Sequence, residues 1–356
     1  MRILLGWELG ANLGHAQNLI KIGSTLQSQG AEVFIAAQQL DAVAGSRCDK
    51  ISLLQAPVWP NLLKDVRTPR WVSDPADYGE IFSRLCLDRE YALGSMLAGW
   101  ETLLNLTAPD LVISDTAPAL NFTASQRYHT IRIGSGYDTP PSEVSEFPRL
   151  RDIPSSGDNA SGLRNINKTL KGLGRTTLRR FPEFFRSDGD YLHTIPELDP
   201  YKNDRPATYC PSTSQVPAVR SSDGEEIFVY LHAMHSAYSP LWKSLASLDA
   251  PVRLFIPSLH PNHREAFDEL GFKWHEAPVP LENILQRSRL IITSGGIGLV
   301  TAAVAQGTPQ VVIHHDLEKQ MTGEAIERIG CGRSLSILNL TEANVTSAIL
   351  ECYSDS

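Results

Sequence analysis

One repeated pattern constrains the fold most: short apolar runs of strand length alternate with helical stretches in both halves of the chain. The clearest case begins with an apolar strand at 290–293 and a glycine-rich turn at 293–298, followed by an alanine- and valine-rich helix and a second strand at 310–313. Strand, turn, helix and strand form a parallel βαβ unit, so we expect an α/β protein with parallel sheets. The turn places backbone N–H groups at the start of a helix, where the helix dipole favours a phosphate.

This turn lies late in a chain of 356 residues, a length that suits two domains better than one core. A dinucleotide-binding dehydrogenase usually has its first such turn near the N-terminus. The late position therefore favours a nucleotide-sugar site in the second of two Rossmann-like domains. The expected strands lie at 3–6, 33–37, 111–114 and 130–134 in the first half, and at 227–231, 252–256, 290–293 and 310–313 in the second.

A stretch rich in Pro, Ser, Thr and Asp separates the two halves at about 195–225. We place the boundary near residue 220, which gives an N-terminal domain with linker over 1–220 and a C-terminal domain over 221–356. The second domain is expected to end in a helix at 341–353. Segments 56–105 and 141–190 interrupt the α/β rhythm of the first domain; the first is interpreted as helices beside a cleft, and together they are expected to build the acceptor pocket.

Composition excludes several classes of protein. The net charge of −8 argues against a nucleic-acid binder, and no apolar run approaches the roughly 20 residues of a membrane helix. The N-terminus lacks the layout of a signal peptide, and the five cysteines are scattered without metal-ligand spacing. We therefore expect a cytoplasmic protein without a metal or other cofactor.

A candidate catalytic pair comes from the first domain. His15 follows the first strand in the first turn of a helix, and Asp115 ends another apolar strand. Both would emerge at the carboxyl edge of a parallel sheet, where a carboxylate can orient an imidazole that acts as a general base. The alternatives are a surface histidine and an aspartate that caps a helix. Glu8 lies in the same loop and is interpreted as a solvated charge.

The candidate donor site comes from the second domain. The turn supplies Ser294, Gly295, Gly296 and Gly298, with an ordinary tight turn as the alternative. After the next strand, Glu318 and Lys319 offer groups that can bind sugar hydroxyls; a charged solvent loop is the alternative.

Weaker signals surround this donor site. The loop with Val279 and Leu281 resembles one that holds a flat base through backbone groups. His232 follows the strand at 227–231 and is a candidate phosphate ligand, with a merely polar loop favoured over it.

With these motifs in place, nearly the whole chain resembles a GT-B-fold glycosyltransferase of the UDP-glycosyltransferase superfamily. Gly14-His15 and Asp115 match the family's N-terminal Gly-His and its acidic partner. The C-terminal signature of His-Gly-Gly, Gly-Val-Pro and Asp-Gln is matched in spacing by Ser294-Gly295-Gly296, Gly307-Thr308-Pro309 and Glu318-Lys319.

The resemblance implies a metal-independent inverting transfer from a UDP- or TDP-sugar to the hydroxyl of a small-molecule or lipid-linked acceptor. By this likeness His15 is the general base, Asp115 supports it, the 293–298 turn holds the diphosphate, and Glu318 and Lys319 contact the sugar.

Three departures from the family pattern define the alternative function. Ser294 replaces a phosphate-binding histidine, Ala302 a ribose-binding glutamate, and Lys319 a glutamine. A degenerate GT-B protein that binds sugar nucleotides or a partner without turnover is the alternative. A sugar-nucleotide 2-epimerase would need a cluster of acidic residues with an arginine, which the sequence does not show. The basic run at 164–186 is a solvated helix face or, less favoured, a contact to an anionic membrane or acceptor.

Overall fold

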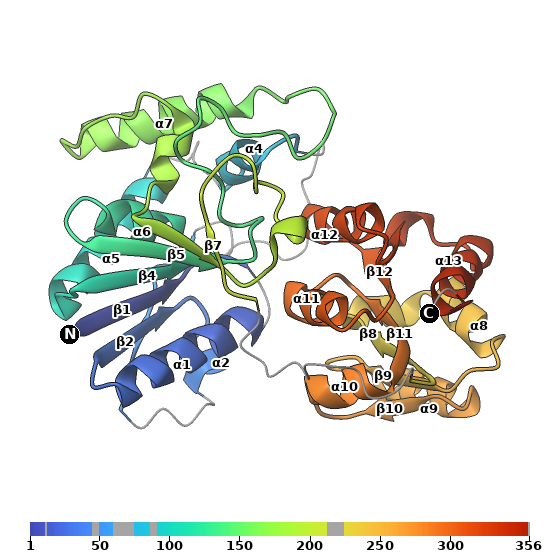
Figure 1. The fold of residues 1–356 in the computed structure, drawn as a ribbon. Coiled ribbons are helices and arrows are strands. Elements are labelled where there is room, and N and C mark those ends of the chain that lie inside the picture. Colours follow the sequence, from blue (N-terminus) through green and yellow to red (C-terminus); the bar gives the residue numbers. More distant parts are fainter. Residues whose placement is uncertain (11–12, 45–49, 60–74, 86–90, 212–223, 355–356) are drawn as a thin grey trace. The chain divides into compact units, whose positions relative to one another are not determined.

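The computed structural model describes residues 1–10, 13–44, 50–59, 75–85, 91–211 and 224–354. It divides into two compact units, one of Met1–Leu192 with Tyr201–Thr208 and one of His193–Pro200 with Tyr209–Ser356. Each unit contains one sheet with helices packed against it (Figure 1). The α/β fold with two parallel sheets is confirmed. The predicted boundary near 220 lies outside the described residues and stays a prediction.

The first unit has a seven-stranded sheet with the order β3-β2-β1-β4-β5-β6-β7. Its strands are β1 (Arg2–Trp7), β2 (Glu32–Ala37), β3 (Ser52–Gln55), β4 (Leu111–Asp115), β5 (His129–Gly134), β6 (Gly189–Leu192) and β7 (Thr208–Tyr209). Its helices are α1 (Leu13–Ser28), α2 (Leu40–Ala44), α4 (Tyr78–Ser83), α5 (Ala92–Thr107), α6 (Pro118–Ala124), α7 (Asp158–Gly172) and the short η1 (Phe181–Phe185).

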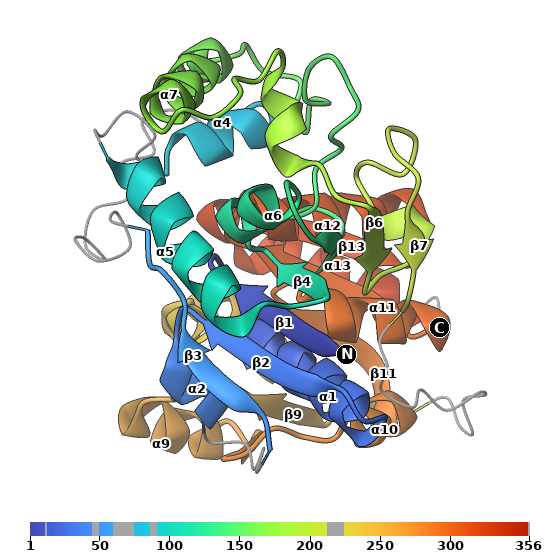
Figure 2. The same cartoon turned by 90° about the vertical axis from the view of Figure 1, so that its left-hand side faces the viewer.

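Helices cover both faces of this sheet, and β1 shows why. Ile3 and Leu5 pack with α1 residues on one face, while Leu4 packs with residues of α5 and α6 on the other. A strand buried on both sides is apolar throughout, which is why β1 was predictable from the sequence. Figure 2 shows α7 and α4 as a further layer beyond α5 and α6.

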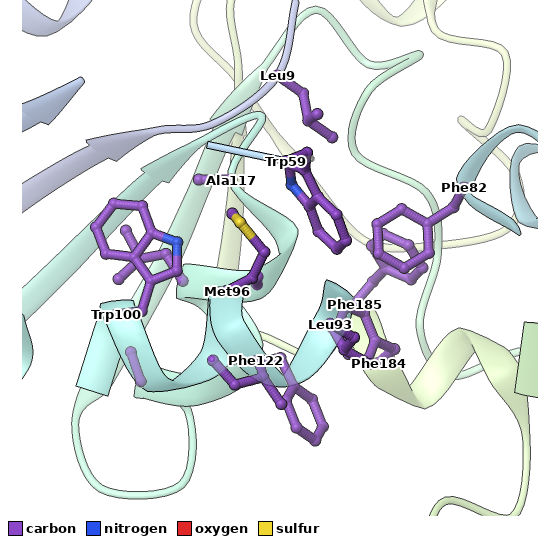
Figure 3. Close-up of a cluster of buried hydrophobic side chains, with 14 of the residues drawn as sticks. Leu9, Trp59, Phe82, Leu93, Met96, Trp100, Ala117, Phe122, Phe184 and Phe185 are labelled. Atoms are coloured by element: carbon purple, nitrogen blue, oxygen red, sulfur yellow. The ribbon is translucent and has the colours of Figure 1, made fainter. Parts of the chain in front are cut away.

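Aromatic side chains of the predicted acceptor segments form part of the core. Trp59, Phe82 and Trp100 are fully buried and pack with Phe122 and other rings (Figure 3). Trp59 meets Phe82 edge to face at 5.7 Å between ring centroids. Helices α4 and α5 lie in the predicted segment, and its buried aromatics belong to the core of the first unit. The predicted acceptor pocket itself stays a prediction; Arg67, Arg70 and Trp71 lie outside the described residues.

The second unit has a six-stranded parallel sheet with the order β10-β9-β8-β11-β12-β13. Its strands are β8 (Glu226–Tyr230), β9 (Val252–Phe255), β10 (Lys273–His275), β11 (Ser288–Thr293), β12 (Gln310–His314) and β13 (Gly332–Ser336). Its helices are α8 (Ser239–Ala246), α9 (Pro261–Glu269), α10 (Leu281–Arg287), α11 (Ile297–Ala305), α12 (Leu317–Arg328) and α13 (Glu342–Ser354), with short turns η2 (Pro196–Leu198), η3 (Ala233–Ala237) and η4 (Ile337–Asn339).

Helix α13 corresponds to the helix predicted at 341–353, and its buried residues Val345 and Ile349 belong to the core of this unit. All eight strands expected from apolar runs are present, with ends within two residues of those predicted. Strand order reverses once in each sheet, between β1 and β4 and between β8 and β11. In open parallel sheets, ligands bind beyond the carboxyl ends of the strands at such a reversal.

Candidate active site

The structure brings His15 and Asp115 together at the reversal in the first sheet. Trp7, the last residue of β1, pairs with Asp115, the last residue of β4, and α1 begins shortly after β1. His15 Nδ1 lies 2.9 Å from Asp115 Oδ1. Because a carboxylate oxygen accepts, Nδ1 donates the hydrogen bond, and Nε2 is left as the acceptor nitrogen of the ring.

Asp115 is not the cap of the following helix. The residue that caps α6 is Ala117, so the helix-cap alternative for Asp115 is wrong. The Asp115 side chain is 1% exposed and His15 is 23% exposed, so the carboxylate is buried behind a ring that ligands can reach. This is the orienting arrangement of a His–Asp pair.

The Nε2 side of the His15 ring depends on Gly10. Gly10 has φ of +87°, and a Cβ atom built on it would lie 2.6 Å from His15 Nε2. Gly10 therefore lets the loop after β1 approach this edge of the ring, where a side chain would collide with it. On its face, the ring stacks on buried Trp7, with ring centroids 5.5 Å apart and planes 24° apart.

Two further polar residues support Asp115, and the sequence analysis missed them. Thr116 Oγ1 lies 3.2 Å from Asp115 Oδ1 and 2.9 Å from Asp138 Oδ2, so its single proton lies between the two carboxylates. Thr116 has φ of +45°, a strained conformation for a β-branched residue. Asp138 in turn accepts from the backbone N–H of Ser135 at 2.8 Å. Nothing in the local sequence marks Asp138, because its link to Asp115 exists only in the folded sheet.

The prediction that Glu8 is a solvated charge is wrong. The side chain is 0% exposed and accepts hydrogen bonds from Trp59 Nε1 at 3.0 Å, Ala119 N at 3.2 Å and Leu120 N at 2.5 Å. Burial raises the pKa of Glu8 from 4.5 to about 7, and the N–H donors oppose that rise. The prediction failed because these donors come from distant parts of the sequence.

The glycine-rich turn lies at the reversal in the second sheet, after β11. Gly295 has φ of +90°, and a Cβ there would lie 3.1 Å from Val312 Cγ1 and 3.3 Å from the Lys319 backbone O. Its glycine is therefore required by backbone conformation and packing. A Cβ on Gly296 or Gly298 would meet no described atom within 4 Å.

The turn leads directly into the N-terminus of α11. Gly296 is the cap residue and has no side chain to occupy the first N–H groups of the helix. The Gly295 N–H is already used, since it donates to Thr293 Oγ1 at 3.3 Å. Ser294 is buried beside it, and Ala302 is buried within α11.

Lys319 lies against the turn. Its Cβ lies 3.3 Å from the position of a Cβ on Gly295, and its ammonium Nζ lies 2.8 Å from Glu318 Oε1. The side chain is only 11% exposed, so the charged-solvent-loop alternative is wrong for Lys319. Asp316 caps α12 by accepting from Lys319 N at 2.9 Å, which fixes the backbone there.

A group of histidines lies near Lys319 in the same unit. The His232 and His315 rings are 5.0 Å apart, and His315 and His235 are 5.6 Å apart. Burial lowers the pKa of His232, and the charges of His315 and Lys319 lower it further. His232 is therefore a neutral ring near a buried cation. His315 was missed, because a histidine pair after a strand carries no specific signal.

Val279 and Leu281 are partly buried and pack against a cluster that includes Phe228 and Leu299. Leu281 is the first residue of α10. Their contact with a nucleotide base stays a prediction.

No group of three or more His, Cys, Asp or Glu side chains suited to a metal ion occurs among the described residues. Within the described parts of the chain, no helix has the length and apolar character needed to cross a bilayer. In the basic run, Arg175 pairs with Glu101 at 2.6 Å and Arg180 with Glu183 at 3.1 Å. These pairs fit the favoured solvated face, while membrane contact stays a prediction.

Sequence comparison finds relatives that carry glycosyltransferase names. Residues 241–356 match the family model "Erythromycin biosynthesis protein CIII-like, C-terminal domain". The chain is 24% identical over 298 residues to a PGL/p-HBAD biosynthesis glycosyltransferase of Mycobacterium tuberculosis, covering 74% of this chain and 67% of that one. It is 29% identical over 93 residues to the NDP-glycosyltransferase YjiC of Bacillus licheniformis, covering 26% of this chain but only 23% of the relative.

Structure comparison covers the whole chain. The calicheamicin glycosyltransferase CalG4 matches with a TM-score of 0.70 at 18% identity, over 100% of this chain and 90% of that one. The glycosyltransferase VinC in complex with DTDP matches with 0.69 at 16% identity, over 100% and 92%. The structure matches show that the chain has the GT-B fold, and together with the sequence matches they support a glycosyltransferase of the UDP-glycosyltransferase superfamily.

Proposed function

We propose that this protein transfers a sugar, with inversion and without a metal, from a UDP- or TDP-sugar to an acceptor hydroxyl. The observation that carries the proposal is the His15 Nδ1–Asp115 Oδ1 hydrogen bond of 2.9 Å at the strand-order reversal, which makes Nε2 the acceptor nitrogen of a ring that is 23% exposed. A neutral imidazole with one nitrogen oriented by a carboxylate is suited to accept a proton at the other.

In the proposed step, His15 Nε2 removes the proton of the acceptor hydroxyl as its oxygen attacks the anomeric carbon of the donor. The new carbon–oxygen bond forms while the bond from that carbon to the diphosphate oxygen breaks. The electron pair of the broken bond leaves with the nucleoside diphosphate. Asp115 stabilises the imidazolium that results, and attack from the side opposite the leaving group inverts the anomeric carbon.

The donor side of the proposal rests on the 293–298 turn. The first N–H groups of α11 and the positive end of its dipole favour the diphosphate, and the open space at Gly296 and Gly298 admits it. Lys319 adds a buried positive charge beside the turn, and Glu318 adds a carboxylate for sugar hydroxyls. Ser294 contributes a neutral hydroxyl, so in this chain the positive charge would come from Lys319.

The names of the structural relatives support the choice of ligands. VinC was solved with DTDP, and SpnG with thymidine diphosphate and, separately, with a spinosyn aglycone. A thymidine or uridine diphosphate donor and a small-molecule hydroxyl acceptor follow for this chain as part of the proposal. A lipid-linked acceptor remains the other candidate.

The test is turnover in His15→Ala, measured as release of nucleoside diphosphate from a panel of UDP- and TDP-sugars with candidate acceptors or water. We expect loss of about 100-fold or more, because a positioned general base contributes about that factor. His129→Ala is the matched control: His129 also pairs with an aspartate, Asp188 at 3.0 Å, but is exposed and at the other end of its strand. Unchanged turnover in His15→Ala would exclude His15 as the base.

A further inference from the structure

Glu8 is a fully buried carboxylate whose hydrogen-bond donors come from two distant segments. Trp59 supplies its indole N–H to Oε2, and the start of α6 supplies the N–H groups of Ala119 and Leu120. A carboxylate only accepts hydrogen bonds, so its two oxygens match three donors without conflict. The reaction proposed above makes no use of this group.

The segments that Glu8 joins are those that carry the catalytic pair. Glu8 lies in the loop from β1 to His15, and α6 begins shortly after Asp115. The two loops also meet directly, since Leu9 N donates to Thr116 O at 3.1 Å. Trp7, on which His15 stacks, donates through Nε1 to Leu9 O at 2.5 Å. Hydrogen bonds of Glu8 and of its neighbour Leu9 thus join the loop after β1 to the segment that follows Asp115, and Trp7 joins the same loop to the His15 ring by stacking.

Packing holds α6 against β1 at the same place. A Cβ on Gly6 would lie 2.1 Å from Leu120 Cδ2, so the leucine fills the space beside a residue without a side chain. Leu120 is therefore held by its backbone N–H on Glu8 and by its side chain against Gly6. Movement of the Glu8 carboxylate would move the start of α6 with it.

We propose that Glu8 is a positioning residue for His15 and Asp115: its carboxylate joins the loop after β1 to the start of α6 and so sets the distance between the two side chains. The inference rests on the proposed role of His15 as the base. Its physical content, the hydrogen bond from His15 Nδ1 to Asp115, is measurable without turnover.

Glu8→Gln is the direct test because it keeps the shape of the side chain. One carboxylate oxygen becomes an NH₂ group that faces N–H donors, so Trp59 or the start of α6 must shift. Glu80→Gln is the matched control. Glu80 is also a fully buried glutamate of the first unit, and it accepts from Ala76 N at 2.9 Å and Ser156 N at 2.7 Å, outside the loops that carry the pair.

The measurement is the tautomer of His15 by nitrogen-15 NMR of the full chain with labelled histidine, at about pH 8 so that Glu8 is ionised. His15→Ala assigns the signal. We expect a protonated Nδ1 and an unprotonated Nε2 in the wild type and in Glu80→Gln. In Glu8→Gln we expect a mixture of tautomers. A folded Glu8→Gln variant with wild-type His15 signals would overturn the proposal.

Trp59→Phe decides the question if Glu8→Gln does not fold. It removes one donor to Glu8 and keeps an aromatic ring, so a smaller shift of the His15 signals in the same direction is expected. Unchanged signals in Trp59→Phe would then overturn the proposal.

Donor turnover separates this inference from the proposed function. With TDP-glucose and water as acceptor, Glu8→Gln is expected to lower kcat about tenfold or more, because small misplacement of a catalytic group has effects of this size. TDP affinity should stay within about twofold. If His15→Ala retains full turnover, the proposed function fails, whereas the tautomer measurement still tests the positioning role. If His15 proves essential but Glu8→Gln changes neither signal nor kcat, only the positioning role fails.

Discussion

At the scale of single residues, the two nitrogens of His15 have different surroundings, and each is set by a neighbour that is distant in sequence. Asp115 accepts the hydrogen bond of Nδ1 from the end of β4, while the backbone of Gly10 lies close to Nε2, where a side chain would collide with the ring. Trp7 limits rotation of the ring by stacking on it. The pair was predictable because both residues follow apolar strands. Glu8, Thr116 and Asp138 were not, because their partners come together only when β1, β4 and β5 form one sheet.

Glu8 also makes stability depend on pH in a defined direction. Its pKa is raised from 4.5 to about 7 in the folded protein, so the folded state keeps a proton that the unfolded chain releases. The contribution of the protonated Glu8 carboxyl to stability is complete below pH 4.5 and is lost as pH rises to about 7. From the size of the pKa shift, the free energy of unfolding falls by about 3 kcal/mol over this range.

Glu8→Gln should remove this contribution. Relative to the wild type, the variant should gain stability as pH rises from 4.5 to 7, measured as the difference in urea midpoint at each pH. Glu80→Gln should lose stability relative to the wild type as pH rises, the opposite change. Hydrogen bonds from Ala76, Ser155 and Ser156 lower the pKa of Glu80 against the effect of burial. If the difference in urea midpoint between the wild type and Glu8→Gln does not change with pH, the pKa of the Glu8 carboxyl is not raised.

Among the helices and strands, the length and apolar content of a strand determined whether it could be predicted from the sequence. Strands such as β8 and β11 are almost continuously buried, and their apolar runs predicted them. The edge strands β10 and β13, Lys-Trp-His and Gly-Arg-Ser-Leu-Ser, were missed because short, partly exposed strands have no such run. The tight turn after β11 was predictable from its glycines. The sequence does not distinguish the glycine that the backbone conformation requires from those beside which space is open.

Two alanine substitutions separate these roles of the turn. Gly295→Ala forces a side chain into a left-handed conformation at φ +90° and against Val312, and should destabilise the protein by about 1–2 kcal/mol. Gly296→Ala, at φ −65° with open space, should leave the thermal midpoint nearly unchanged but weaken TDP binding. Thermal unfolding and calorimetric titration of both variants check this. Equal TDP affinity in Gly296→Ala and the wild type would place the diphosphate elsewhere.

The start of α12 supplies the charge for the leaving diphosphate in our proposal. Lys319→Met should weaken binding of TDP about tenfold and binding of thymidine by much less, because a hydrogen bond to a charged group is worth about 1.5–3 kcal/mol. Glu318→Gln should act in the opposite direction, since Glu318 pairs with the Lys319 ammonium at 2.8 Å and repels phosphate. Introducing Ser294→His into Lys319→Met should restore part of the affinity. Equal losses for TDP and thymidine would argue against a diphosphate contact.

At the scale of the whole molecule, each unit repeats one design: an open parallel sheet whose strand order reverses once, with polar residues beyond the carboxyl ends of the strands at the reversal. The first unit places a His–Asp pair there, and the second a glycine-rich turn with a buried lysine. The parallel α/β class was predictable from the alternation of apolar runs and helices. The core role of the aromatics in the predicted acceptor segments was not predictable, because large rings beside a sheet serve a core as readily as a pocket.

Calorimetric titration of the wild-type protein with TDP and UDP, with TMP and UMP as comparison, shows whether the chain binds the diphosphate of a nucleotide sugar. The claim that this chain uses a nucleotide-diphosphate sugar predicts saturable binding of at least one diphosphate, about tenfold tighter than the matching monophosphate, since a further phosphate adds charged hydrogen bonds at the turn. Failure of both diphosphates to bind at millimolar concentration would contradict it.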